Sequence, residues 1–148
     1  MTPDDSIIEL SANIDDMTAE EIGYAFDRIF EAGAVDVYAL STVMKKNRPG
    51  IILNVLCKDD KKEAVVRAVF KHTKTIGVRE KVMDRYILKR EFYNIETPLG
   101  NVKVKKVNGY GTSREKLEYD DLNSIASKND MSISEARAYA EKFKKSDI

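Results

Sequence analysis

The segment MKKNRPG, residues 44–50, concentrates positive charge between two apolar segments that read as strands. Lys45, Lys46 and Arg48 stand within a few residues of one another, and Asn47 adds an amide. Lysine ammonium groups and a bidentate arginine are the donors that a chain of phosphates needs. A charged hairpin tip is equally compatible with an ordinary solvated loop. On chemistry alone, both interpretations stay open.

An acidic pair occupies the segment NIDDM, residues 13–17, between a predicted strand and a predicted helix. Asp15 and Asp16 offer the oxygen ligands that a hard divalent cation such as Mg²⁺ prefers. The simpler alternative is that these carboxylates interact favourably with the dipole of the following helix.

A third polar segment, HTKTIGVR, spans residues 72–79 at the end of a predicted helix. Thr73 and Thr75 offer hydroxyl groups, and Arg79 offers a second guanidinium. Lys74 lies where a cation is favoured by the helix dipole alone.

Composition excludes several classes of function. The single histidine and the single cysteine cannot form a Ser-His-Asp or Cys-His arrangement, or a closed site of soft metal ligands. Any bound metal is therefore expected to be a hard cation on oxygen ligands. One cysteine also fits a reducing cytoplasm. Because 25 basic residues balance 25 acidic ones, we expect no nucleic-acid or membrane partner.

The predicted elements of the first part follow the order βαββαβ. Thr18 and Glu21 form a capping box at the first helix, and Pro49–Gly50 predict a type II turn between the second and third strands. This order indicates an α+β, ferredoxin-like core with an antiparallel sheet and two helices on one face. The predicted strands are 6–13, 34–44, 51–57 and 78–89, and the predicted helices are 18–33 and 60–72.

The second part of the chain is predicted to be a β-hairpin followed by a helical appendage. Val102 and Val104 alternate with Lys103 and Lys105, so the valines and the lysines face opposite ways. Residues 108–115 are polar and glycine-bearing and predict a linker. Helices are expected at 117–130 and 132–145. We therefore predict a ferredoxin-like core at 1–90 and a hairpin with helical appendage at 91–148.

Several motifs together resemble the C-terminal part of the LarC family. The segments NIDDM, EEIGYAFDRIFEAGAVDV, MKKNRPG, TIGVR, ETPLGNVKVK and EYDDL occur in this order, from about residue 9 to about residue 140. Each motif is short, but the ordered set is specific. The resemblance implies a CTP-dependent nickel-inserting cyclometallase, a lyase of lactate racemase maturation.

The resemblance also implies ligands and partners. The substrate would be pyridinium-3,5-bisthiocarboxylic acid mononucleotide, with nickel as the inserted metal and the nickel-pincer nucleotide as product. CTP would bind with Mg²⁺ or Mn²⁺. Full-length members carry a large N-terminal region with a histidine-rich segment. That region is absent from this sequence, so we expect the chain to be a C-terminal piece that works with it.

The family reading gives roles to the candidate residues. Asp15 and Asp16 would hold or orient the cation, and the basic, amide and hydroxyl side chains would bind the nucleotide. An alternative is a non-catalytic, nucleotide-binding regulatory module, because fold does not fix function. Ferredoxin-like domains often assemble, so we also expect a homo-oligomer. The expected nucleotide-binding residues are Lys45, Lys46, Asn47, Arg48, Thr73, Thr75 and Arg79.

Overall fold

A computed structural model describes residues 1–144 of the chain. It divides the chain into two compact units, with the boundary between Tyr86 and Ile87. Each unit has its own buried hydrophobic cluster. The units are therefore described one at a time.

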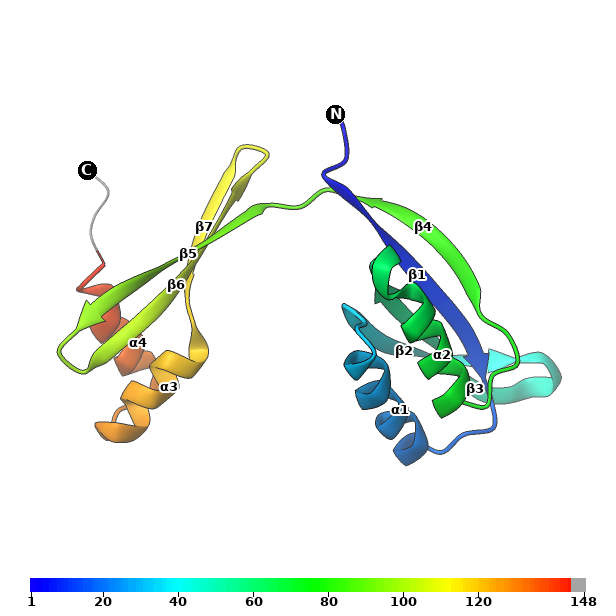
Figure 1. Ribbon diagram of the computed structural model, residues 1–148. Coiled ribbons are helices and arrows are strands. Elements are labelled where there is room, and N and C mark those ends of the chain that lie inside the picture. The colour runs from blue at the N-terminus through cyan, green and yellow to red at the C-terminus, as the bar shows by residue number, and fades with distance from the viewer. Residues whose placement is uncertain (145–148) are drawn as a thin grey trace. The chain divides into compact units, whose positions relative to one another are not determined.

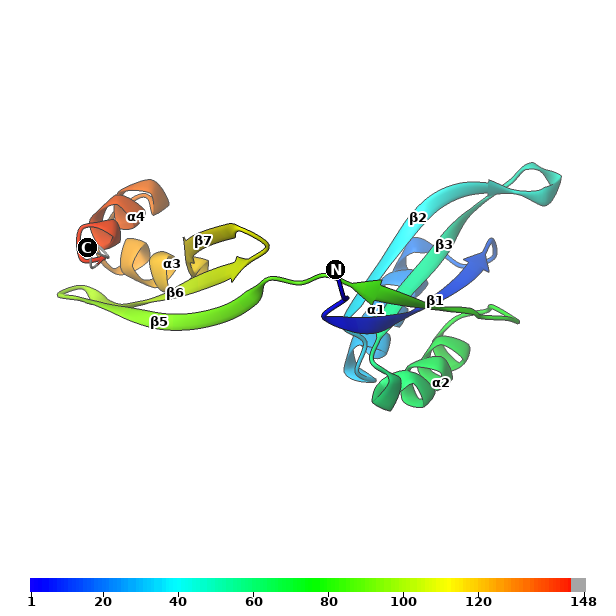
Figure 2. The same ribbon diagram turned by 90° about the horizontal axis from the view of Figure 1, so that it is seen from above.

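The first unit is a four-stranded antiparallel sheet with two helices on one face (Figures 1 and 2). The strand order is β2-β3-β1-β4, which is the ferredoxin-like arrangement predicted from the sequence. Two short 3₁₀ turns precede β3 and α2. The elements are β1 Asp5–Ile14, α1 Ala19–Glu31, β2 Asp36–Met44, β3 Arg48–Cys57, α2 Lys62–His72 and β4 Arg79–Arg85.

Alternation of apolar side chains fixes which face of this sheet the helices cover. Ile8, Leu10 and Ile14 of β1 are buried in the cluster that α1 and α2 complete. The predicted capping box is confirmed: the Thr18 hydroxyl accepts from the backbone N–H of Glu21, whose carboxylate accepts from the backbone N–H of Thr18.

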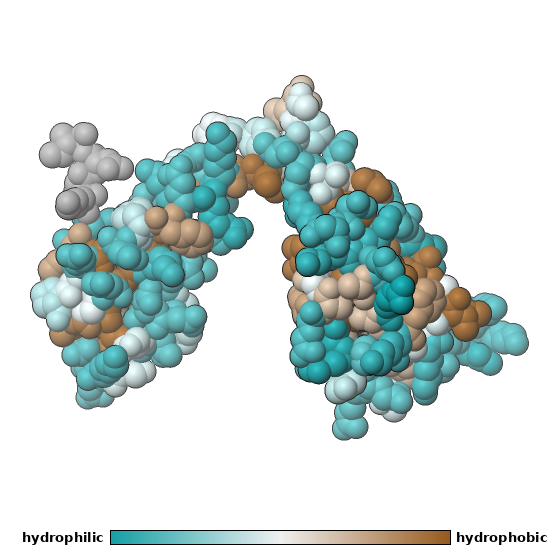
Figure 3. All heavy atoms as spheres, in the orientation of Figure 1, coloured by the Kyte–Doolittle hydropathy of each residue, from teal (hydrophilic) through white to brown (hydrophobic). Residues whose placement is uncertain are grey.

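The topology brings three connections to one edge of the sheet. In an antiparallel sheet of this order, the β1–α1, β2–β3 and α2–β4 connections all leave at the same end of the strands. Each of the three candidate polar segments is one of these connections. The β2–β3 hairpin extends beyond the others, and hydrophilic side chains cover its tip (Figure 3).

The predicted turn at Pro49–Gly50 is wrong. The connection is the three residues 45–47, in which Lys46 and Asn47 adopt the left-handed backbone region with φ of 62° and 57°. Pro49 and Gly50 lie inside β3, opposite Val43 and Thr42. Gly50 is instead needed for a close approach, because a Cβ added there would lie 2.6 Å from the carbonyl oxygen of Ile14.

The second unit is a three-stranded antiparallel sheet, order β5-β6-β7, with two helices on one face (Figure 2). The predicted hairpin is present and gains a third strand. The predicted linker at 108–115 is wrong, because those residues end β6, make a turn and enter β7. The predicted helix 132–145 ends earlier, and Lys145 lies outside the described residues. The elements are β5 Lys89–Thr97, β6 Gly100–Gly109, β7 Thr112–Leu117, α3 Tyr119–Lys128 and α4 Ile133–Glu141.

Replacing Gly50 by alanine is expected to destabilise the first unit by about 1–3 kcal/mol, because the added methyl group meets the backbone of β1. Urea denaturation followed by circular dichroism measures the change. Gly23→Ala is the matched control: no atom lies within 4 Å of its added Cβ, and an alanine in the interior of α1 should stabilise by about 0.5–1 kcal/mol. Equal effects of the two substitutions would contradict the close approach.

Candidate functional site

An open pocket of about 480 Å³ lies where the β1–α1 and α2–β4 connections meet. Both connections leave the same edge of the sheet, so residues about sixty positions apart in sequence lie side by side. Of the predicted site residues, Asp15, Asp16, Thr75 and Arg79 line this pocket. The other lining residues are Asn13, Lys74, Ile76, Gly77 and Val78.

Arg79, the first residue of β4, is held beside the end of β1. Its Nη2 donates a hydrogen bond of 2.7 Å to Oδ1 of Asn13. The two side chains share a sheet face, because Arg79 pairs with Ser11 and Asn13 lies two residues further along β1. The guanidinium keeps other N–H donors for an anion in the pocket.

Lys74 ties the two connections together. Its Nζ donates to the carbonyl oxygen of Asp16 at 2.9 Å and lies 3.7 Å from Oε1 of Glu21. The pKa of Glu21 is lowered, first by the hydrogen bond from the backbone N–H of Thr18 and also by the charge of Lys74. Lys74 therefore places its positive charge beside the backbone carbonyl group of Asp16, one residue of the acidic pair.

Arg48 brings the basic hairpin to the acidic pair. Its Nη1 lies 3.4 Å from Oδ2 of Asp15. The Arg48 side chain is 58% exposed, so this ion pair is weak and can exchange for another anion. Within the described part of the chain, the side chains of Lys45 and Lys46 make no hydrogen bond or ion pair, and both residues are exposed, as is Asn47.

The two threonines have different roles. The Thr73 hydroxyl donates to the carbonyl oxygen of Val69 at 2.8 Å, and its oxygen accepts from the backbone N–H of Thr75 at 3.3 Å. Thr73 therefore terminates α2 and shapes the connection, and it does not line the pocket. The Thr75 hydroxyl lines the pocket and donates to the carbonyl oxygen of Gly77 at 2.9 Å.

Two pocket residues, Asn13 and Lys74, were not among the expected nucleotide ligands. Asn13 ends the alternating pattern of β1 on the face opposite the helices, which is a signal that the sequence does carry. From the sequence, Lys74 is explained equally well as a cation that interacts with the dipole at the C-terminus of α2. Only the approach of the two connections shows that it reaches Asp16.

The histidine and the cysteine have structural positions. The His72 ring packs edge-on against Tyr24, with ring centroids 5.8 Å apart. Cys57 is buried in the core, and burial raises the pKa of its thiol. Within residues 1–144, no three His, Cys, Asp or Glu side chains lie close enough together to bind one metal ion. Asp15 and Asp16 thus offer two carboxylates.

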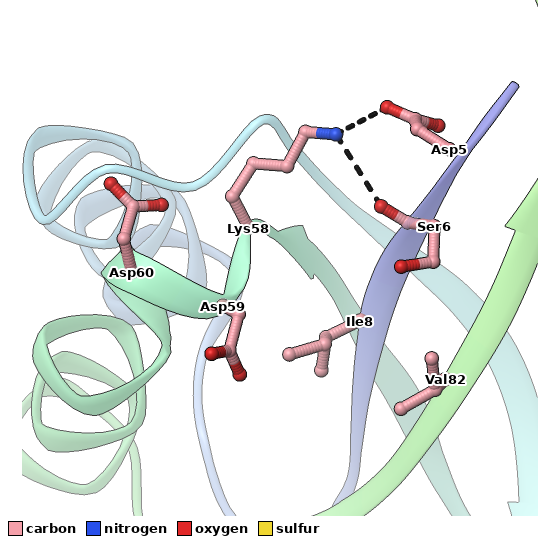
Figure 4. Close-up of a pocket in the computed structure, with 7 residues that line it drawn as sticks. All are labelled: Asp5, Ser6, Ile8, Lys58, Asp59, Asp60 and Val82. Atoms are coloured by element: carbon pink, nitrogen blue, oxygen red, sulfur yellow. Dashed lines mark hydrogen bonds and ion pairs between the residues drawn. The ribbon is translucent and has the colours of Figure 1, made fainter.

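A second pocket, of about 590 Å³, lies at the opposite end of β1 (Figure 4). Asp5 accepts hydrogen bonds from Nε and Nη2 of Arg85, at 2.8 and 2.7 Å, and from Nζ of Lys58. Lys58 also donates to the carbonyl oxygen of Ser6 at 3.3 Å. The hydrogen bonds from Arg85, and then from Lys58, hold the pKa of Asp5 well below its ordinary value. This cluster clamps β1 to β4 and to the end of β3.

Comparison with known proteins decides the family. The model of the family described as nickel insertion protein matches residues 2–137. The chain belongs to this family. The relationship inferred from the motifs is thereby confirmed.

Two relatives show how much of a family member the chain represents. A relative from Enterococcus faecalis is 40% identical over 131 residues, which cover 88% of this chain and 40% of the relative. The pyridinium-3,5-bisthiocarboxylic acid mononucleotide nickel insertion protein of Acetivibrio thermocellus is 38% identical over 123 residues, which cover 83% and 30%. The chain therefore spans less than half the length of these relatives.

Two solved structures support the fold. The apo form of LarC2, the C-terminal domain of a cyclometallase involved in the synthesis of the NPN cofactor of lactate racemase, matches with a TM-score of 0.82 and 32% identity. The match covers 94% of this chain and 96% of that one. Protein MK0293 from Methanopyrus kandleri, at 24% identity and a TM-score of 0.71, shares the fold. Across residues 1–144, no helix has the length and hydrophobicity that crossing a membrane requires.

The Asp5 clamp predicts a pH-dependent stability. Because the folded-state pKa of Asp5 lies below the unfolded value of about 3.9, its contribution is complete above that pH and is lost as pH falls through the folded pKa. Asp5→Asn should therefore lower the free energy of unfolding at pH 7, and the difference from wild type should shrink below about pH 4. Asp84→Asn, on an exposed side chain of β4, is the control and should give a small difference at every pH. Urea midpoints from pH 2 to 7 test this, and a gap for Asp5→Asn that is as large at pH 2 as at pH 7 would contradict it.

Proposed function

We propose that this domain binds CTP together with Mg²⁺ or Mn²⁺ and takes part in nickel insertion. The observation that carries the proposal is the convergence of three polar connections at one edge of the sheet. Arg48 from the β2–β3 hairpin, and Lys74 and Arg79 from the α2–β4 connection, meet near the Asp15–Asp16 pair of the β1–α1 connection. Cations that surround two carboxylates suit a metal-bound triphosphate better than either a metal or an anion alone.

The donor set fits the triphosphate. Arg79 and Thr75 line the pocket, and Arg48 reaches its acidic rim. Lys45 and Lys46 extend the positive charge along the hairpin, with ammonium groups that the described residues leave without a partner. Asn47 adds an exposed amide beside them. Phosphate oxygens would replace Asp15 as the partner of Arg48.

The donor set also fits a hard cation. Mg²⁺ is typically bound by one or two carboxylates, with phosphate and water oxygens as its other ligands. Asp15 and Asp16 are two adjacent carboxylates on the pocket wall. When bound, the cation would neutralise phosphate charge. The protein's own contribution is to hold the carboxylates in place, which Lys74 does through the Asp16 carbonyl.

The reaction proposed for the whole protein takes its substrate and nickel from the name of a relative, and the use of CTP is our own proposal. CTP would transfer its cytidylyl group to the phosphate of pyridinium-3,5-bisthiocarboxylic acid mononucleotide, and pyrophosphate would leave. The cations of the hairpin and of Arg79 would stabilise the charge that builds up on the leaving pyrophosphate. Nickel would then enter from the N-terminal region that longer family members carry, and we expect the chain to assemble with copies of itself.

Nucleotide selectivity is the first test. Calorimetry of the whole chain with CTP, ATP, GTP and UTP, each with and without Mn²⁺, should show metal-dependent binding that is tightest for CTP. The reason is that the negative charge of the triphosphate requires both the basic side chains of the site and a cation. The cytosine base of the nucleotide provides the selectivity. Equal and weak binding of all four nucleotides would contradict the proposal.

The hairpin variant tests the phosphate contact. Lys46→Ala with Arg48→Ala should weaken CTP binding about tenfold or more, since hydrogen bonds to charged groups contribute about 1.5–3 kcal/mol each. Arg67→Ala with Lys128→Ala removes the same two charge types from exposed helix positions and should leave CTP affinity unchanged. Unchanged affinity in the hairpin variant would show that the hairpin is only a solvated loop.

The acidic pair can be tested through the metal. Asp15→Asn with Asp16→Asn keeps the side-chain size but removes both carboxylates, so CTP binding should lose most of its dependence on Mn²⁺ concentration. Asp59→Asn with Asp60→Asn, at the other end of the unit, is the matched control. A metal dependence retained by the Asp15–Asp16 variant would mean that the cation binds elsewhere.

A further inference from the structure

The second unit carries a basic sheet face that the proposed nucleotide site does not use. Ile95, Val102, Val104 and Leu117 are buried against α3 and α4, which lie on one side of the sheet (Figure 2). Strand alternation and the strand register turn a different set of side chains to the other side. We call this side the open basic face; it comprises Arg90, Phe92, Lys103, Lys105, Arg114 and Lys116.

The positive charges of the open basic face are not neutralised within the described residues. None of its five basic side chains makes a hydrogen bond or ion pair in residues 1–144. On the helix side, by contrast, Glu115 lies 3.7 Å from Nζ of Lys106 and 2.5 Å from Nζ of Lys144. Glu96 is the one acidic residue of β5–β7 on the open side. It pairs with Asn101 next to the β5–β6 turn, at one end of the sheet. The face therefore favours an anionic ligand.

An exposed aromatic ring stands among these cations. Phe92 is 53% exposed, and its direct partners across the sheet are Lys105 and then Lys116. Neighbouring strands lie about 4.8 Å apart, and side chains two residues apart on one strand lie about 7 Å apart. A ligand about 10 Å long that rests on the Phe92 ring can thus reach cations on β6 and on β7.

We propose that the open basic face binds the pyridinium mononucleotide on which the proposed function acts. This inference rests on that function, because the ligand is its substrate. The name of the Acetivibrio thermocellus relative describes a planar pyridinium ring with two thiocarboxylic acids and a phosphate. The ring would stack on Phe92, and the anionic groups would bind the surrounding lysines and arginines.

The number of aromatic side chains favours a single ring over a nucleic-acid strand. Sheets that bind single-stranded RNA stack two or three bases on as many aromatic side chains. Phe92 is the only aromatic residue of β5–β7 on the open basic face, because Tyr93 points to the helix side, where its hydroxyl lies 3.3 Å from Glu115. One ring platform surrounded by cations fits one anionic aromatic ligand.

A fluorescence titration tests this proposal directly. The chain contains no tryptophan, so Phe92→Trp introduces a single indole reporter on the face, opposite Lys105. A pyridinium ring stacked on an excited indole quenches its fluorescence. The probe is nicotinic acid mononucleotide, which has a pyridinium ring, one carboxylate and a phosphate. Saturable quenching is expected.

Charge reversal on the face provides the matched comparison. Adding Lys105→Glu and Lys116→Glu should weaken the quenching about tenfold or more. Adding Lys128→Glu and Arg137→Glu changes the net charge equally on exposed helix positions and should leave it unchanged. Quenching that does not saturate, or that both charge reversals weaken equally, overturns the proposal. Tighter binding of an oligothymidylate than of the mononucleotide also overturns it, in favour of a nucleic-acid surface.

The same variants separate this proposal from the nucleotide site. CTP binding with Mn²⁺ should be unchanged by Lys105→Glu and Lys116→Glu, because the expected nucleotide ligands belong to the first unit. If the chain fails to bind CTP but still binds the pyridinium probe, the CTP site is wrong and the open basic face stands. If CTP binds and the probe does not, the open basic face is wrong and the CTP site stands.

Discussion

The antiparallel direction of the four strands is the constraint on which the candidate site depends. With the order β2-β3-β1-β4, the connections after β1, β2 and α2 must leave at one edge of the sheet. Polar segments that are ordinary surface loops in sequence then face one another. The proposed metal-bound triphosphate is argued from the convergence of the acidic pair and the basic hairpin, because neither segment alone indicates it. The site is thus a consequence of chain direction more than of any single motif.

Backbone contacts hold the connections at that edge in place. Lys74 holds the Asp16 carbonyl, and Gly50 lets β3 approach the carbonyl of Ile14, directly before Asp15. Thr73 ends α2 and holds the start of the next connection. These contacts use backbone groups and therefore leave the carboxylates and guanidinium groups available. The Asp5 clamp stabilises the opposite end of β1 in the same unit.

The second unit distributes its charge differently. On the helix side of its sheet, Glu115 pairs with Lys106 and Lys144, whereas the other side keeps its cations unpaired within residues 1–144. Such a separation costs electrostatic self-repulsion, which a bound anion would relieve. A chain whose net charge is zero can therefore carry local clusters of positive charge. The overall charge balance, which argued against a nucleic-acid or membrane partner, does not exclude such local clusters.

The sequence by itself determined the element types, the ferredoxin-like order and the capping box at Thr18, because alternation, helical spacing and capping are local properties. It also determined the family, through an ordered set of motifs. Only the tertiary structure decided that the hairpin turns at Lys46–Asn47, since Gly50 is required inside β3 by a neighbour 36 residues earlier in the chain, Ile14. It likewise decided that residues 108–115 pair as a strand and that Lys74 reaches Asp16. Contacts between segments distant in sequence leave no local pattern, so these features could not be predicted from it.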